Sequence, residues 1–195
     1  MRKARSEMIE ETRTKLIAVA RLHFGNRGYG KTVMDEMTAE AGLTRGALYH
    51  HFGDKKGLFL AVLIELDNEM DQKLAAISAE SSDPWQAFKS RCQTFICMAV
   101  EPQIQQIMLR DAPSVLGADY LQASKGDCVG SISDLLKHLM KRGLVRQAPA
   151  EPLARLIHGG LMDAALWIAD SDQPQQALMD SLQSLDLLLD GLKVA

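Results

Sequence analysis

The chain has 195 residues, of which 47% are hydrophobic, 24% charged and 5% aromatic. This length allows one ordinary domain or two small ones that share a core, and the composition excludes disordered, collagen-like and disulfide-scaffold proteins. The longest apolar run, Leu58 to Ile64, is far shorter than the ~20 residues of a membrane-spanning helix, so we expect no membrane partner.

The two ends of the chain carry opposite net charge. Residues 1–56 hold 11 Lys and Arg against 7 Asp and Glu, a net charge of +4, whereas the remaining residues hold 11 against 18, a net charge of -7. A basic head on an acidic body is expected where only the head meets a polyanion such as nucleic acid. Random variation of surface charge is the alternative.

The N-terminus is basic but lacks the apolar stretch of a secretory signal, so we expect a cytoplasmic protein. Cys92, Cys97 and Cys128 are an odd number of cysteines without Cys-x-x-Cys spacing, which argues against a disulfide framework and a zinc site. We expect buried, reduced thiols, and a redox role stays open as the alternative.

Apolar residues recur at helical spacing along almost the whole chain, and almost no segment shows the strict alternation of a half-buried strand. The clearest stripes are Leu16, Ile17, Ala20 and Phe24; Leu58, Val62, Leu66, Met70, Leu74 and Ile77; Trp85, Phe88, Cys92, Phe95 and Ala99; and Leu178, Leu182, Leu185, Leu189 and Leu192. This pattern predicts an all-α protein.

Prolines and glycines fall between these stripes and indicate where helices begin and end. Asp83-Pro84 is typical of an N-cap followed by a first-turn proline, and Gly143-Leu144 is typical of a helix C-terminus. Residues 78–83 and 113–125 are the predicted loops.

A short helix is predicted to start near Thr32, whose hydroxyl can cap it, and to end at Gly42. Its buried face is expected to be Val33, Met37 and Ala41. Glycine permits the left-handed backbone of a tight turn between helices. Thr44 is then placed to cap a second short helix over residues 45–52, and the result is a helix-turn-helix.

On the second helix, Leu48 and Phe52 share the side expected to be buried. Arg45, Gly46, Tyr49 and His50 spread over another side, where a guanidinium, a bare backbone, a phenol and an imidazole suit a DNA major groove. The alternative is an ordinary solvated helix face, which explains an exposed aromatic side chain least well.

Motifs from the first helix to the start of the fourth carry a family resemblance. They are Phe24, Gly28-Tyr29, Thr32-Val33, Ala41-Gly42-Leu43-Thr44, Gly46-Ala47-Leu48-Tyr49, His51-Phe52, Lys55 and Leu58. With these residues the chain resembles the TetR (tetracycline repressor) family of transcriptional regulators over about residues 9–63. It departs from the family pattern at Met37-Thr38, where Ile-Ala is usual, and at Lys56, where an acidic residue is common.

The resemblance implies roughly nine helices, with a three-helix DNA-binding head in residues 1–53 and a larger effector-binding and dimerisation body in residues 54–195. Arg45 is expected to read a base edge, Tyr49 and Lys55 to contact phosphates, and Arg2, Lys3 and Arg5 to form a basic arm. The predicted DNA-contacting residues are Thr32, Thr44, Arg45, Gly46, Ala47, Tyr49, His50 and Lys55.

The expected partners are a second copy of the chain, a palindromic double-stranded DNA operator and a small, partly apolar effector that releases the repressor. The predicted dimer interface is Leu153, Ile157, Gly160, Leu161, Ala164, Leu178, Leu182, Leu185 and Leu189, with burial inside one subunit as the alternative. The predicted effector contacts are Met70, Phe88, Cys92, Phe95, Met108, Met162 and Trp167, for which ordinary core packing is the alternative.

Residues 25–32 match the phosphate-binding pattern Gly-x4-Gly-Lys-Thr, but an amphipathic helix precedes them where a P-loop requires a strand. No paired carboxylates, Ser or Cys nucleophile motif or metal-ligand spacing is present, so we expect no enzyme activity, cofactor or metal. A protein-interaction module whose head no longer binds DNA is the remaining alternative.

Overall fold

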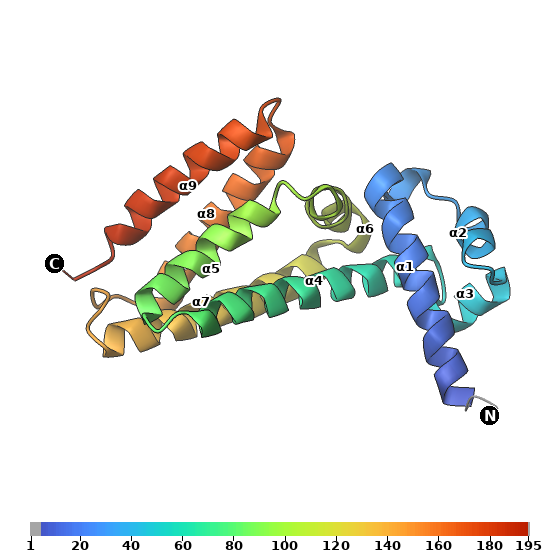
Figure 1. Ribbon diagram of the computed structural model, residues 1–195, viewed down its shortest axis with the longest axis horizontal. Coiled ribbons are helices and arrows are strands. Elements are labelled where there is room, and N and C mark those ends of the chain that lie inside the picture. Colours follow the sequence, from blue (N-terminus) through green and yellow to red (C-terminus); the bar gives the residue numbers. More distant parts are fainter. Residues whose placement is uncertain (1–4, 195) are drawn as a thin grey trace. The chain divides into compact units, whose positions relative to one another are not determined.

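The computed structural model describes the backbone of residues 5–194 and the side chains of residues 7–77, 81–117 and 126–194. Regular secondary structure in this part of the chain is helical, apart from one isolated antiparallel bridge between Val145 and Lys193 (Figure 1). The predicted all-α class is therefore confirmed. None of the helices formed by these residues is both long and apolar enough to span a membrane.

Nine α-helices and one π-helix follow one another along the described residues. They are α1 (Arg5–Lys31), α2 (Met34–Glu40), α3 (Arg45–Phe52), α4 (Lys55–Glu80), α5 (Pro84–Met98), the π-helix η1 (Ile104–Asp111), α6 (Ala112–Leu116), α7 (Ala118–Lys141), α8 (Ala150–Asp170) and α9 (Pro174–Asp190).

The chain divides into two compact units. The first comprises the residues up to Glu69 together with Pro102–Gly117, and the second comprises Met70–Glu101 and the residues from Ala118 onward. The helix α4 therefore contributes residues to both units. The predicted division at residues 53 and 54 separates roles rather than compact units, and it stays a prediction.

The core of the first unit forms on the predicted stripe of α1. Leu16, Ile17, Ala20 and Phe24 are all buried, as helical spacing requires of residues on one face. The Phe24 ring lies 5.2 Å from the ring of Phe59 on α4, and Tyr29 completes an aromatic cluster with both. These contacts pack α1 against the first turns of α4.

The predicted loop over residues 113–125 is wrong. Pro113 lies in the first turn of α6, where a helix needs no amide hydrogen, and α7 already begins at Ala118. Gly117, with φ of 84°, makes the break between these helices. The loop predicted over residues 78–83 is shorter than expected, because α4 continues to Glu80.

The second unit contains two helix ends that were predicted correctly. The Asp83 carboxylate accepts a hydrogen bond from the Trp85 amide at 2.9 Å, and Pro84 occupies the first turn of α5. Gly143 has φ of 70°, and the amide of Leu144 donates to the carbonyl of Leu139, as in a Schellman motif.

The helices α5 and α9 are joined by a polar network in the second unit. The Lys89 ammonium, which is largely buried, contacts the carboxylates of Asp186 at 3.4 Å and Asp190 at 3.0 Å. Gln93 donates to Asp186 at 2.6 Å. The hydrogen bond to Asp190 raises the pKa of Lys89 more than desolvation lowers it. This network supports the position of α9.

Candidate functional site

The turn between α2 and α3 has the backbone that the sequence predicts. The amide of Gly42 donates to the carbonyl of Ala39 at 3.0 Å, and the amide of Leu43 donates to the carbonyl of Thr38 at 2.8 Å. Gly42 has φ of 66°. These are the two hydrogen bonds of a Schellman motif, which ends α2 and starts the turn.

The helix α3 spans the predicted residues and is capped as predicted. The Thr44 hydroxyl accepts a hydrogen bond from the amide of Ala47 at 3.2 Å. Leu48 is fully buried, whereas Phe52 is only half-buried and lies 5.8 Å from the guanidinium carbon of Arg13. The buried side of α3 thus faces the rest of the first unit through Leu48.

Four predicted DNA-contacting residues lie on the exposed part of α3. Arg45, Gly46 and His50 are exposed, and the Tyr49 side chain keeps 45% of its surface accessible. Ala47 is half-buried between them. A helix capped at its N-terminus therefore presents donors and an aromatic ring of the kind that contacts base edges and phosphates.

The predicted cap by Thr32 is wrong. The Thr32 hydroxyl is buried and donates backwards to the carbonyl of Gly28 at 2.8 Å. The N-cap of α2 is Val33, which is exposed rather than part of the buried face, and it makes no side-chain hydrogen bond to the helix. The Thr32 hydroxyl is thus committed to the end of α1, where Gly28 breaks the helix with φ of 77°.

Residues 25–32, which match the phosphate-binding pattern, lie at the end of α1 and in the residue after it. A P-loop would follow a strand, so this structural context does not support nucleotide binding.

Lys55 lies at the first turn of α4, close to Tyr29. Its ammonium nitrogen is 4.4 Å from the centre of the Tyr29 ring. Burial lowers the pKa of Lys55, and the nearby Asp111 carboxylate opposes this change. The predicted phosphate contact would therefore draw the ammonium away from an aromatic ring, whereas the neighbouring Lys56 is exposed. Arg2 and Lys3 of the predicted basic arm lie outside the described residues.

Three acidic residues of α2 pair with basic residues of its neighbours. Asp35 pairs with Arg45 of α3 at 3.0 Å. Glu36 pairs with Arg27 of α1, and the Glu40 carboxylate accepts a hydrogen bond from the Nε2 atom of His23 at 2.7 Å. These pairs link α2 to the helices before and after it in the chain.

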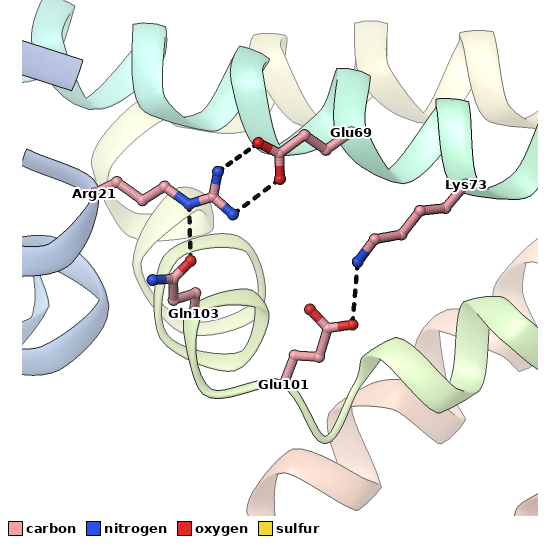
Figure 2. Close-up of polar contacts among 5 residues, drawn as sticks. All are labelled: Arg21, Glu69, Lys73, Glu101 and Gln103. Atoms are coloured by element: carbon pink, nitrogen blue, oxygen red, sulfur yellow. Dashed lines mark hydrogen bonds and ion pairs between the residues drawn. The ribbon is translucent and has the colours of Figure 1, made fainter. Parts of the chain in front are cut away.

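In the first unit, η1 is attached to α1 at both of its ends, of which Figure 2 shows the one at Gln103. Arg21 of α1 donates to both carboxylate oxygens of Glu69, at 2.6 and 2.9 Å, and through Nε to Gln103 at 2.8 Å. At the other end, the Tyr29 amide donates to Asp111 at 2.7 Å. Figure 2 also shows, within the second unit, the pair between Lys73 and Glu101 at 3.4 Å.

The second unit contains a cavity of about 320 Å³. Four predicted effector contacts line it, namely Met70, Phe88, Cys92 and Phe95. The other three predicted contacts are not among its lining residues. Met108 lies on η1 in the first unit, Met162 is half-buried on α8, and Trp167 lies at a separate groove. The helix α4 contributes Asp71, Leu74 and Ala75 to the lining, α5 contributes Arg91, α7 contributes Asp127, Cys128, Ser131 and Ile132, and α8 contributes His158 and Leu161.

The prediction from the sequence did not include the polar lining residues of this cavity, because it was based on apolar residues alone. The helical spacing itself contains the signal. Arg91 lies three residues after Phe88 and four before Phe95, so the three side chains share one face of α5. In the structure Arg91 contacts the Ser131 hydroxyl at 3.5 Å. The cavity thus combines apolar walls with a guanidinium, carboxylates and an imidazole.

The three cysteines are thiols in different surroundings. Burial raises the pKa of the Cys92 thiol to about 12, although the charge of Arg91 opposes this. Cys97 and Cys128 are exposed, and partial burial also raises the pKa of Cys97. The expectation of three buried thiols is therefore met only by Cys92.

A second hollow of about 410 Å³ is an apolar groove along α8 and α9, which lie side by side in Figure 1. Seven predicted interface residues line it, whereas Leu178 and Leu182 are not among the lining residues. Leu185 and Leu189 are already buried within the subunit. The lining residues from the predicted interface are Leu153, Ile157, Gly160, Leu161, Ala164, Leu185 and Leu189.

The most exposed residues of this groove were not predicted for it. Leu156 is 75% exposed, Leu188 is 71% exposed and Trp167 is 53% exposed. Large apolar side chains gathered at one exposed place usually mark an interaction surface. Burial within one subunit therefore accounts for Leu161, Leu185 and Leu189 of the predicted interface, whereas Leu156, Trp167 and Leu188 remain exposed.

Two family descriptions match the sequence. "Bacterial regulatory proteins, tetR family" matches residues 16–62, and "Tetracyclin repressor-like, C-terminal domain" matches residues 85–192, which is more than half of the chain. The chain belongs to the TetR family. A TetR-family transcriptional regulator from Pectobacterium atrosepticum, known from a crystal structure, is 48% identical, with a TM-score of 0.87 and coverage of 99% of both chains.

Other TetR-family relatives are more distant. The transposon Tn10 TetC protein of Escherichia coli is 24% identical over 82% of this chain and 81% of its own length. The HTH-type transcriptional regulator TtgR of Pseudomonas putida is 37% identical over 40% of this chain and 38% of TtgR. The members of this family named here are transcriptional regulators and not enzymes. The resemblance read from the sequence is thereby confirmed.

The first prediction concerns the turn before α3 of this TetR-family protein. Gly42→Ala should lower the free energy of unfolding by about 1 kcal/mol, because an L residue at this left-handed position is strained. The matched control is Gly46→Ala, since Gly46 has ordinary helical backbone and its added Cβ would meet nothing closer than 3.7 Å. That control should be neutral or stabilising by up to about 1 kcal/mol. Urea unfolding measures both, and equal effects would contradict the assigned backbone.

The second prediction concerns the three thiols. Iodoacetamide at mildly alkaline pH should alkylate Cys128 and Cys97 well before Cys92, because only a thiolate reacts and Cys92 is both buried and protonated. Mass spectrometry of peptides gives the three rates. A ligand that occupies the cavity should slow reaction at Cys128 but not at Cys97, which does not line it. Alkylation of Cys92 as fast as Cys128 would contradict the burial.

Proposed function

We propose that this TetR-family protein is a homodimeric repressor that binds a palindromic DNA operator through α2 and α3 and is released by a small, partly apolar effector. The observation that carries the proposal is the exposed face of α3, where Arg45, Gly46, Tyr49 and His50 lie on a capped helix. The net charge of +4 on residues 1–56 supports contact with a polyanion.

Each DNA contact follows from the chemistry of the side chain. Arg45 donates to the edge of a guanine, and Tyr49 contacts a phosphate through its hydroxyl. His50 contacts a base or a phosphate. Gly46 and Ala47 have no bulky side chains, so the backbone of α3 approaches the bases closely. Lys55 contacts a phosphate only after its ammonium leaves the Tyr29 ring.

The groove of α8 and α9 supports a dimer as the active species. Its exposed Leu156, Trp167 and Leu188 would leave water if a second copy packed against them. A two-fold dimer presents two copies of α3 to DNA, with centres one helical turn of about 34–36 Å apart, and so favours a palindromic operator.

The 320 Å³ cavity supports a small effector as the release signal. Its apolar walls would hold a hydrophobic body, and Arg91, Asp127 and His158 would fix a polar end. An effector changes operator affinity only if it prefers one conformation of the protein. We expect α4 to transmit this preference, because it contributes Met70 and Leu74 to the cavity and its first turn follows α3 directly.

The experiment that tests the proposal is a titration of the purified protein against fluorescent DNA from upstream of its own gene, with scrambled DNA of equal length as the control. Anisotropy should show saturable binding that weakens with salt and favours the upstream DNA by ~10³-fold or more. DNA selected from a random pool supplies the operator if it lies elsewhere. Weak and equal binding to every sequence would contradict operator recognition.

Arg45→Ala should weaken operator binding by ~1–3 kcal/mol and relax the base preference at one position of each half-site. The reason is that a guanidinium donates two hydrogen bonds to guanine and alanine donates none. Competition between the operator and its single-base-pair variants measures the preference. An equal loss of affinity for all sequences would contradict base reading by Arg45 and assign it to a phosphate.

Leu188→Glu should shift the protein towards monomers and weaken operator binding, because it places a charge in the apolar groove. The matched control is Leu187→Glu, since Leu187 is 78% exposed and does not line the groove. Sedimentation velocity measures the monomer fraction, and anisotropy measures the affinity. An unchanged dimer in Leu188→Glu would place the interface elsewhere.

A further inference from the structure

Asp35, in the first turn of α2, pairs with Arg45, the first residue of α3. The Arg45 Nε atom lies 3.0 Å from the Asp35 Oδ1 atom, and Nη1 lies 3.5 Å from Oδ2. Both side chains are more than half exposed, with 56% of Arg45 and 61% of Asp35 accessible. The carboxylate therefore lies on the same surface as the residue proposed to read a base.

The donors of Arg45 divide into two sets. A guanidinium has five N–H groups in one plane. The Asp35 carboxylate lies 3.0 Å from Nε and accepts a hydrogen bond from one N–H of Nη1 at 3.5 Å. The other N–H of Nη1 and both N–H groups of Nη2, which are the outer donors, make no hydrogen bond to Asp35. A guanine presents two acceptors, O6 and N7, in the major groove, and two outer donors match them. Asp35 can thus hold Arg45 without occupying the donors that a base requires.

Stability does not account for this pair. Ion pairs between exposed side chains contribute little to folding, because water competes for both partners. A carboxylate on a DNA-facing surface is also repelled by phosphates. An arginine side chain has many rotamers, however, and loses that freedom when it binds one base. A partner that restricts the rotamers beforehand reduces the loss.

We propose that Asp35 is a positioning residue that fixes the Arg45 guanidinium for contact with one base and so determines operator specificity. This inference rests on the proposed function, since it requires that Arg45 reads DNA. Asp35 makes no contact with the base in this arrangement. Its effect on specificity passes through Arg45 alone.

The chain supplies a matched control for the charge of Asp35. Glu36 is the next residue of α2, is about half exposed, and pairs with Arg27 of α1. Asp35→Asn and Glu36→Gln therefore remove the same charge from neighbouring positions. Either change should raise affinity for every DNA sequence, because one repulsive charge is lost. Only Asp35→Asn alters the partner of Arg45.

The experiment measures binding of the full-length protein to its operator and to a set of duplexes that each carry one base-pair substitution. The variants are Asp35→Asn, Glu36→Gln, Arg45→Ala and the double variant Asp35→Asn with Arg45→Ala, all at one salt concentration. Circular dichroism checks the helix content of each. If Asp35→Asn loses helix content, Asp35→Ser replaces it, because serine also suits the first turn of a helix.

Asp35→Asn should reduce discrimination about threefold to tenfold at the same base pair where Arg45→Ala relaxes it, and at no other. Glu36→Gln should leave the whole profile of base preference unchanged. In the Arg45→Ala background, Asp35→Asn should change no base preference at all. A purely structural role for Asp35 would not produce this dependence on position.

Two results overturn the inference, and they can be told apart. If the wild-type protein discriminates between bases and the profile of Asp35→Asn equals that of Glu36→Gln, Asp35 acts only as a charge. The same conclusion follows if Asp35→Asn alters preference at base pairs that Arg45 does not read. If the wild-type protein itself shows no base preference, the proposed function fails, and the role of Asp35 fails with it.

Discussion

The left-handed backbone at Gly42 is the constraint on which the proposed DNA-binding surface depends. Two hydrogen bonds close the end of α2 at this residue, and only two residues separate it from the start of α3. The direction of α3 is thus decided by a few backbone angles. The capping hydroxyl of Thr44 and the burial of Leu48 then fix where the helix begins and which side faces inward. The opposite side of α3 is left exposed, and it is the side proposed to contact DNA.

The ion pairs of α2 add a second level of order to this arrangement. The helix has only seven residues, too few to be stable alone, and three of its acidic side chains pair with α1 or α3. Each pair also removes positive potential from the surface proposed to contact DNA. The ion pairs thus order α2 and α3, and they also weaken the general electrostatic attraction of this unit to a polyanion.

Local chemistry made α3 predictable. Thr44, Gly42 and the spacing of apolar residues act within a few positions, so residues 45–52 could be delimited from sequence. Thr32 could not be assigned in the same way, because its hydroxyl can cap a following helix or bond backwards to Gly28, and packing decides between them. Pro113 was misread for a related reason, since proline both ends and begins helices.

The cavity and the groove were only partly predictable because both need tertiary information. Apolar spacing found Phe88, Cys92 and Phe95 in the cavity, since they share one face of α5. It could not show that Trp167 belongs to the groove, because an exposed and a buried tryptophan look alike in a sequence. The Asp35 pair with Arg45 was also invisible, since it joins two helices whose relative direction follows from the turn.

The two tryptophans differ in their surroundings, and this makes the protein its own optical probe. Trp85 is almost completely buried, and its ring lies 6.0 Å from Phe88, which lines the cavity. Trp167 is half exposed beside the apolar groove. Indole emission depends on contact with water, so one residue reports on the interior of the second unit and the other on coverage of α8 and α9. Ligand entry and self-association therefore carry separate spectroscopic signatures in the unlabelled chain.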